Sequence, residues 1–143
     1  MKIQDVIKGN GGDSVVTITP DAAVRDLVAL LAEHNIGAVI VSTDGTSVEG
    51  IVSERDVVRR LRDRDDVLEA QVGEIMTSRV RTCAPQHDLD ELMALMTEHR
   101  IRHVPVVADG TLVGVVSIGD VVKSRITQLT FERDQLDSYV HQT

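Results

Sequence analysis

The sequence contains almost no aromatic residues: one Phe, one Tyr and no Trp among 143 residues. Hydrophobic residues nevertheless make up 42% of the chain, so the core has to be built from aliphatic side chains and methionine. The scarcity of aromatic side chains also argues against binding of single-stranded nucleic acids, because proteins of that class stack bases on aromatic platforms.

Positive charge is also in short supply. The 15 Lys and Arg residues are outnumbered by 23 Asp and Glu residues, which gives a formal net charge of −8. A protein that binds nucleic acid needs basic residues to neutralise phosphates. We therefore expect no nucleic-acid partner, although a local basic cluster is still enough to hold a small anion.

The chain has one cysteine, Cys83, and no long apolar run. A single cysteine cannot form an internal disulfide, so nothing in the sequence requires an oxidising compartment. No run approaches the ~20 apolar residues of a membrane-spanning helix, and the first residues lack the apolar segment of a secretion signal. We expect a cytoplasmic protein that does not contact membranes.

Two parts of the chain carry the same pattern in the same order. Residues 27–36, LVALLAEHNI, match residues 92–101, LMALMTEHRI, and residues 44–58 match residues 109–122 after one deletion. Ordered matches of this kind indicate two similar units, and one unit alone has a small core, so the two are expected to pack together. The predicted division is residues 1–66 for the first unit, 67–126 for the second and 127–143 for a C-terminal helical extension.

Both units are predicted to contain the same order of elements, β-α-β-β-α. Alternating residues predict strands at 15–19 and 79–84, each stopped by a proline, and apolar residues at helical spacing predict helices over 21–35 and 87–100. Two strands joined by a tight Asp-Gly-Thr turn follow, and then a second helix. The expected fold is α/β (α+β), with two units related by pseudo-twofold symmetry and their sheets packed together. The predicted strand pairs are 36–43 with 48–53 and 103–108 with 112–117.

The second helix of each unit is predicted to begin at a Ser-x-x-Asp motif, Ser53 to Asp56 and Ser117 to Asp120. One interpretation is a capping box, in which the serine and the acidic residue satisfy N–H groups at the helix start. The other is a ligand site: an ionised carboxylate can accept both hydroxyls of a ribose, and a helix N-terminus attracts phosphate. The sequence leaves both interpretations open, and the two are compatible.

The chain resembles a tandem CBS domain pair, also called a Bateman module, over residues 3–126. The motifs that carry the resemblance are the helix endings EHNI and EHRI, the strand HVPVV and the Gly-x-x-Ser-x-x-Asp pattern that ends each unit. The first unit departs from the family pattern, because its strand IGAVIVST lacks the proline that Pro105 supplies in the second. Among such pairs the chain is similar to the small stand-alone modules of bacteria and organelles.

This resemblance implies a regulatory protein that binds an adenosine-containing ligand and forms a homodimer. AMP is the expected ligand, NAD or NADH is the second choice, and a downstream protein partner is left unidentified. No metal is expected. No enzymatic activity is expected either, because the sequence shows no nucleophile–base pair with a supporting group, no metal constellation and no phosphate loop. The alternative is a structural dimerisation module whose ligand sites are vestigial.

The resemblance places Arg102 and His103 at positions that reach phosphate in nucleotide-binding CBS pairs. Because they begin the strand beside Ser117, we expect the site at Ser117 and Asp120 to be the better phosphate site. It is expected to be completed by the segment before Pro20. The residues predicted for this site are Ile18, Thr19, Val24, Arg102, His103, Val104, Pro105, Ser117, Gly119 and Asp120.

A second site is expected at Ser53 and Asp56, completed by the segment before Pro85. Gly37 and Ala38 stand there in place of the arginine and histidine and offer nothing to a phosphate, although Arg55 is able to compensate. The residues predicted for this site are Gly37, Ala38, Val39, Ser53, Arg55, Asp56, Thr82, Cys83 and Ala84.

The C-terminal extension is predicted to be helical and partly apolar. Val122, Ile126, Leu129, Leu136 and Val140 recur at near-helical spacing, and the two aromatic residues of the chain lie in the same segment. Aromatic residues are enriched at protein interfaces. Two alternatives stay open: the helix packs back on its own domain, or it makes a dimer or partner contact.

Overall fold

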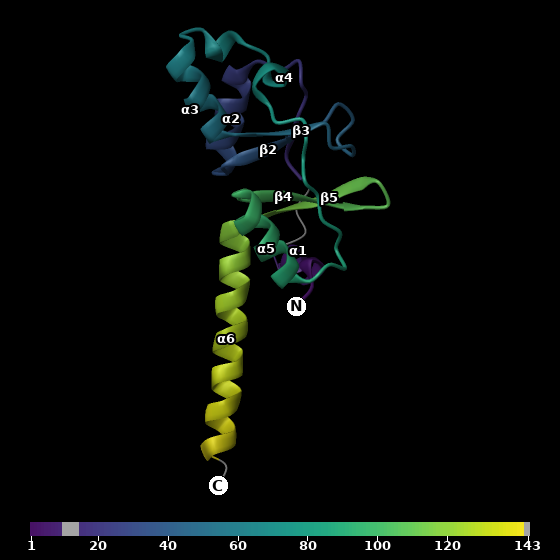
Figure 1. Cartoon of the computed structure of the whole chain (residues 1–143), viewed down its shortest axis with the longest axis vertical. Coiled ribbons are helices and arrows are strands. Elements are labelled where there is room, and N and C mark those ends of the chain that lie inside the picture. The colour runs from purple at the N-terminus through teal and green to yellow at the C-terminus, as the bar shows by residue number, and fades with distance from the viewer. Residues whose placement is uncertain (10–14, 142–143) are drawn as a thin grey trace.

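The computed structural model describes residues 1–9 and 15–141 and contains two small sheets that lie next to each other, with helices on their outer sides (Figure 1). This arrangement confirms the predicted mixed α/β fold of two repeated units. The elements, in chain order, are α1 (Ile3–Gly9), β1 (Thr17–Ile18), α2 (Val24–His34), β2 (Ala38–Val41), β3 (Gly50–Ser53), α3 (Glu54–Asp63), the 3-10 helix η1 (Val67–Glu69), α4 (Val72–Ile75), α5 (Leu89–His99), β4 (His103–Ala108), β5 (Thr111–Ser117) and α6 (Ile118–His141).

Helices α2 and α5 bury their apolar faces and end in the same way, at a residue with left-handed backbone conformation: Asn35 with φ 51° and Arg100 with φ 54°. Both begin two or three residues later than the sequence predicted. The residues just before each helix are extended because they pair with a distant segment. The N–H of Val24 donates to the carbonyl of Ala70 (2.8 Å), and the N–H of Leu89 donates to that of Met1 (2.9 Å).

The two sheets differ by one strand. In the first half, β1 pairs parallel with β2, and β2 pairs antiparallel with β3. In the second half only β4 and β5 form a sheet, and the predicted strand at 79–84 is reduced to a single parallel bridge between Cys83 and Val106.

A proline explains why this predicted strand fails to form. In the first half, the parallel pair of Thr17 with Ile40 needs the N–H of Ile40. Pro105 occupies the equivalent position of the second half, and proline has no N–H to donate. The ladder therefore cannot extend past the hydrogen bond from Cys83 N–H to the Pro105 carbonyl (3.0 Å).

The two hairpins also differ. Asp109 and Gly110 both have positive φ, 51° and 77°, which is the geometry of a tight two-residue turn between β4 and β5. The expected tight turn at Asp44 is wrong, because residues 42–49 form a longer loop between β2 and β3. The Asp44 carboxylate holds this loop by accepting from the N–H groups of Thr46 (2.9 Å) and Ser47 (2.8 Å).

Each lead helix packs into the core of the opposite half. Ile3 of α1 is buried with residues of the second half, and Val72 of α4 is buried with residues of the first. The backbone follows the same exchange, since Ile3 N–H donates to the carbonyl of His87 (3.0 Å) and Val72 N–H donates to that of Ala22 (2.8 Å). Each half therefore needs the other to complete its core, and this fixes the clefts between them. Within the described residues, no helix has the length and apolar character required to cross a membrane.

Candidate functional site

Two clefts lie between the halves, each containing one Ser-x-x-Asp motif. The Ser53 cleft has a volume of about 690 Å³ and the Ser117 cleft about 490 Å³. Gly37, Ala38 and His103 line both. The Ser53 cleft is further lined by Ile51, Ser53, Glu54, Arg55, Asp56, Arg59, Thr77, Arg79, Val80, Arg81, His99, Arg100, Ile101 and Arg102. The Ser117 cleft is further lined by Ile7, Val15, Val16, Asn35, Ile36, Val113, Gly114, Val115, Ser117 and Asp120.

Both motifs form capping boxes. The N–H of Ser53 donates to Asp56 Oδ2 (2.8 Å) and the N–H of Asp56 donates to Ser53 Oγ (3.4 Å). The corresponding distances at Ser117 and Asp120 are 2.9 and 3.1 Å. Among the described residues, every hydrogen bond to these two carboxylates ends on Oδ2. The capping interpretation is therefore confirmed. The capping hydrogen bonds leave Oδ1 of each carboxylate free to accept a hydrogen bond from a ligand in the cleft.

The segments that complete the clefts lie upstream of the predicted ones. Residues 77 and 79–81, rather than Thr82, Cys83 and Ala84, line the Ser53 cleft. Val15 and Val16, rather than Ile18 and Thr19, line the Ser117 cleft. Nearer each proline the chain leaves the cleft. Ile18 packs against the core of the first half and Cys83 is buried in the core of the second, whereas Thr19 and Thr82 are exposed outside the clefts.

Several other predicted site residues are buried and do not line either cleft. Val24 and Val104 are fully buried, and Val39 is nearly so. Val39 in β2 and Val104 in β4 point into the two hydrophobic cores. Pro105 is also buried, but it lies on the opposite face of β4 from Val104, because successive residues alternate between the two faces of a sheet. Gly119 faces a groove at the base of α6 instead of the Ser117 cleft.

Cys83 is also a core residue. Its side chain is 7% exposed, and its Sγ lies 3.7 Å from the carbonyl oxygen of Pro105. Burial raises the pKa of the Cys83 thiol to about 11. Because the thiolate is the reactive form of cysteine, this residue is chemically inert at neutral pH.

Positive charge is concentrated in the Ser53 cleft, which reverses the expectation from the sequence. Arg102 was expected beside Ser117, and its carbonyl does accept from Ile118 N–H (2.8 Å) at the start of α6. Its side chain, however, lines the Ser53 cleft. Six arginines line that cleft, whereas no lysine or arginine is found among the described residues that line the Ser117 cleft. The six are Arg55, Arg59, Arg79, Arg81, Arg100 and Arg102.

The arginines that sequence reasoning missed follow a recognisable pattern. Arg79 and Arg81 are separated by one residue. In extended chain, residues at this spacing point to the same side, so this pair was a usable signal for a basic surface. Arg100 gave no such signal, because it ends α5 with a left-handed backbone.

His103 stands where the two clefts meet. A Cβ atom placed on Gly37 would lie 3.5 Å from the imidazole Cε1, so the glycine of one half packs against the histidine of the other. Burial lowers the pKa of His103, and Arg102 lowers it further, while Asp120 and Glu54 act in the opposite direction. The ring is therefore neutral at neutral pH and gains a positive charge only in more acidic solution.

Comparison with known proteins identifies the family. A family model described as CBS domain matches residues 12–63 and 72–126. The chain is 36% identical over 146 residues to the mitochondrial CBS domain-containing protein CBSX3 of Arabidopsis thaliana, covering 96% of this chain and 71% of that protein.

Solved structures agree with the family match. A protein with CBS domains from Burkholderia ambifaria MC40-6 is similar with a TM-score of 0.82 and 44% identity, covering 89% of this chain and 95% of that chain. The CBS domain protein PAE2072 from Pyrobaculum aerophilum, complexed with AMP, is similar with a TM-score of 0.75 and 29% identity, covering 84% of this chain and 89% of that chain. The chain therefore belongs to the CBS domain family and carries two CBS domains, as its repeated motifs predicted.

Proposed function

We propose that this protein is a regulatory module that binds AMP between its two halves, with the Ser53 cleft as the principal site. The observation that carries the proposal is the combination in one cleft of a helix N-terminus, a carboxylate with an uncommitted oxygen and six arginines. These groups complement the ribose and the phosphate of a nucleotide. The similar protein PAE2072 that is complexed with AMP supports the choice of ligand.

Each part of AMP has a partner in this cleft. Asp56 Oδ1 accepts the ribose hydroxyls, while Oδ2 continues to cap α3. The phosphate lies at the start of α3, where Ser53 and Arg55 provide donors and the helix dipole provides positive potential. The adenine base lies among apolar side chains of the cleft wall, which include Ile51, Val80 and Ile101.

NAD or NADH is the second candidate. The two clefts share Gly37, Ala38 and His103, so one dinucleotide bound across this junction would place a nucleoside in each cleft. The Ser117 cleft is smaller and lacks arginines, and it therefore suits the less charged part of such a ligand.

The ligand acts by changing the relation between the halves rather than by being converted. A ligand bound between two halves shifts their equilibrium by the difference in its affinity for the two arrangements. We propose that this shift is passed to a partner protein by a homodimer with no catalytic activity. We also propose a cytoplasmic location, although one relative is named as mitochondrial.

A ligand panel tests the proposal directly. Purified protein is titrated with AMP, ADP, ATP, NAD and NADH while thermal unfolding and calorimetric binding are measured. A ligand present at about 100 times its Kd adds ~2.7 kcal/mol to the free energy of unfolding, and AMP is expected to produce the largest stabilisation. If no nucleotide stabilises the protein, the alternative of a structural module with vestigial sites is favoured. Conversion of any nucleotide would show that the protein is an enzyme.

A further inference from the structure

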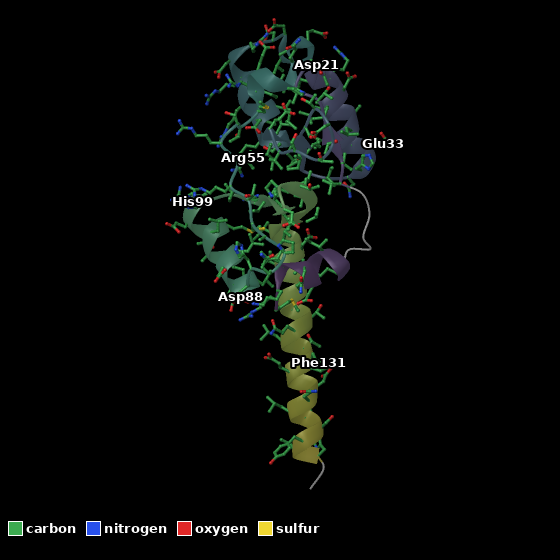
Figure 2. The ribbon with its side chains drawn as sticks, turned by 90° about the vertical axis from the view of Figure 1, so that its right-hand side faces the viewer. Asp21, Glu33, Arg55, Asp88, His99 and Phe131 are labelled. Carbon is green, nitrogen blue, oxygen red and sulfur yellow. The ribbon has the colours of Figure 1, made fainter. Side chains whose placement is uncertain are left out.

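Helix α6 continues far beyond the two CBS domains. The family match ends at residue 126, whereas α6 runs to His141. Val121 is its one buried side chain among the described residues, and every residue from 129 to 141 is exposed. Figures 1 and 2 show this part of the helix projecting away from both sheets. Of the two alternatives left by the sequence, packing back on the domain is therefore wrong for this segment.

An isolated projecting helix lacks the packing that normally stabilises helices in proteins. Six apolar residues nevertheless lie along one side of α6, in a line that only Arg133 interrupts, here called the α6 stripe. Their exposed fractions lie between 38% and 66%, so the stripe faces away from the core of the protein. The stripe consists of Ile118, Val122, Ile126, Leu129, Leu136 and Val140.

The spacing of the residues in the stripe indicates that a second helix covers it. Val122, Leu129 and Leu136 recur every seven residues, and so do Ile126, Arg133 and Val140. Apolar residues that recur at two positions every seven residues are the pattern of a coiled coil, and Arg133 is the one interruption of that pattern here. A seven-residue period keeps apolar residues facing a second helix along the whole length of α6. Contact with a flat protein surface would not need this period.

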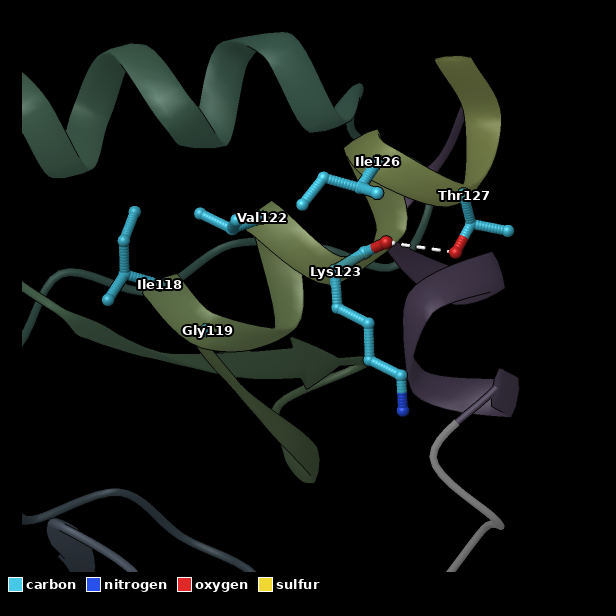
Figure 3. Close-up of a pocket in the computed structure, with 6 residues that line it drawn as sticks. All are labelled: Ile118, Gly119, Val122, Lys123, Ile126 and Thr127. Carbon is cyan, nitrogen blue, oxygen red and sulfur yellow. Dashed lines mark hydrogen bonds between the residues drawn. The ribbon is translucent and has the colours of Figure 1, made fainter. Parts of the chain in front are cut away.

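The base of the stripe opens into a shallow groove. Ile118, Val122 and Ile126 project in a row along one side of α6, and Gly119 lies beside this row (Figure 3). The groove has a volume of about 480 Å³ and is continuous with the exposed stripe. It provides room for the end of a second helix that lies along α6.

Charges beside the stripe select the orientation of the second helix. In a parallel pair, the seven-residue repeat places Glu132 next to the partner's Asp137, which brings like charges together. In an antiparallel pair with Ile126 opposite the partner's Leu136, Lys123 lies next to the partner's Asp137, and the same ion pair forms twice by symmetry. Glu132 meets the partner's Glu132 only once, at the symmetry axis, where the two Arg133 side chains lie beside it. Among the described residues, neither Lys123 nor Asp137 takes part in an ion pair within the chain.

We propose that α6 of a second copy of this chain covers the α6 stripe as an antiparallel two-stranded coiled coil. This pairing places the far end of each helix in the groove at the base of the other. Arg133, the one charged residue within the line of apolar residues, lies close to the partner's Glu132. The extension therefore serves as the dimerisation element, independently of whether the clefts hold a nucleotide.

The mass of the full chain in solution tests this pairing. Sedimentation equilibrium is expected to give twice the chain mass for the unmodified protein and the chain mass for Leu129→Asp. Phe131→Asp is the matched control, because Phe131 is 61% exposed and Leu129 is 53% exposed but Phe131 lies on another side of the helix. The control is expected to remain dimeric. A monomeric unmodified protein, or a dimer that survives Leu129→Asp, would overturn the proposal.

Cysteine cross-linking tests the orientation without disturbing the fold. The double variant Ile126→Cys and Leu136→Cys is expected to form a covalent dimer under mild oxidation, because the two positions face each other in the antiparallel pair. Each single variant is expected to stay uncross-linked. Cys83 does not interfere, since it is buried. Efficient cross-linking of either single variant would show a parallel pair and overturn the proposed orientation, and failure of the double variant to cross-link would overturn the pairing itself.

Discussion

The Ser53 and Ser117 clefts are built from equivalent elements, yet they offer a ligand very different surroundings. Each has a capped helix N-terminus and an aspartate with an uncommitted oxygen. At the equivalent positions, however, Arg81 faces one cleft where Val16 faces the other, and Arg100 is matched by Asn35. The backbone repeat thus provides two sites of the same shape, and substitutions at matched positions give them different charge.

This difference teaches that the shared motif alone does not determine which cleft binds an anion. The Ser-x-x-Asp motif contributes similar hydrogen bonds on both sides. Selectivity for phosphate has to come from the surrounding side chains, because a guanidinium forms charge-assisted hydrogen bonds that are about twice as strong as neutral ones. We therefore expect variants in the two clefts to have unequal effects on AMP binding.

The largest expected inequality is between Asp56→Ala and Asp120→Ala. Hydrogen bonds to a charged group contribute ~1.5–3 kcal/mol, so loss of the Asp56 carboxylate should raise the Kd for AMP by about 10- to 150-fold. Asp120→Ala should change the Kd much less. Isothermal titration calorimetry of the folded variants measures both values.

These two variants control for each other. Each removes the acidic half of one capping box, and loss of a cap costs about 1 kcal/mol of stability. A purely structural effect would therefore weaken both variants alike. If Asp120→Ala reduced AMP affinity more than Asp56→Ala, the principal site would be the Ser117 cleft, as the sequence alone had predicted.

A smaller effect is expected from exchanging one matched pair of residues. Arg100 and Asn35 have nearly the same left-handed backbone, with φ 54° and 51°, so each residue already occupies the backbone conformation that it would have after the exchange. Arg100→Asn should raise the Kd for AMP by about 3- to 5-fold, in line with the ~1 kcal/mol of an exposed ion pair. Asn35→Arg should strengthen anion binding in the Ser117 cleft.

Salt provides the readout for this exchange. Binding that depends on exposed charges weakens as salt screens them, so the Kd of Arg100→Asn should rise less steeply with salt concentration than that of the unmodified protein. A Kd and salt dependence identical to those of the unmodified protein would remove Arg100 from the proposed site.

The sequence predicted the helix starts in the clefts better than the segments that complete the clefts. The repeated motifs placed Ser53, Asp56, Ser117 and Asp120 at helix starts between the halves, because helix capping depends on local spacing. The residues that complete each cleft depend on how the chain turns before a proline and on which half supplies it. Those are tertiary properties, and so Ile18 and the other residues next to the prolines were assigned to the clefts on the basis of neighbouring sequence alone.

Proline had a second consequence that the pattern of alternating residues did not reveal. The stretches 15–19 and 79–84 look alike as strands, but a strand needs donors on its neighbour. Ile40 provides one and Pro105 does not. The sequence shows that the first half lacks this proline. Only the structure shows that Ile40 and Pro105 occupy the same place in the two sheets, and therefore that the proline prevents the third strand of the second sheet.

The smallest expected effect concerns His103, where the two clefts meet. Its pKa in the folded protein lies below its ordinary value of 6.5, mainly because the ring is desolvated. Above about pH 6.5 the ring is neutral in both the folded and the unfolded chain. As the pH falls below that value, the unfolded chain takes up a proton that the folded chain does not, so the free energy of unfolding decreases.

Urea unfolding between about pH 7.5 and pH 5.5 measures this decrease across the range in which histidine titrates. His103→Gln should flatten the dependence of stability on pH, because glutamine has no proton to gain. If His103→Gln retained the slope of the unmodified protein, the pH dependence would come from other groups. A flattened slope would instead show that the His103 ring stays neutral in the folded protein over this pH range, so that the wall between the clefts gains no positive charge while the unfolded chain does.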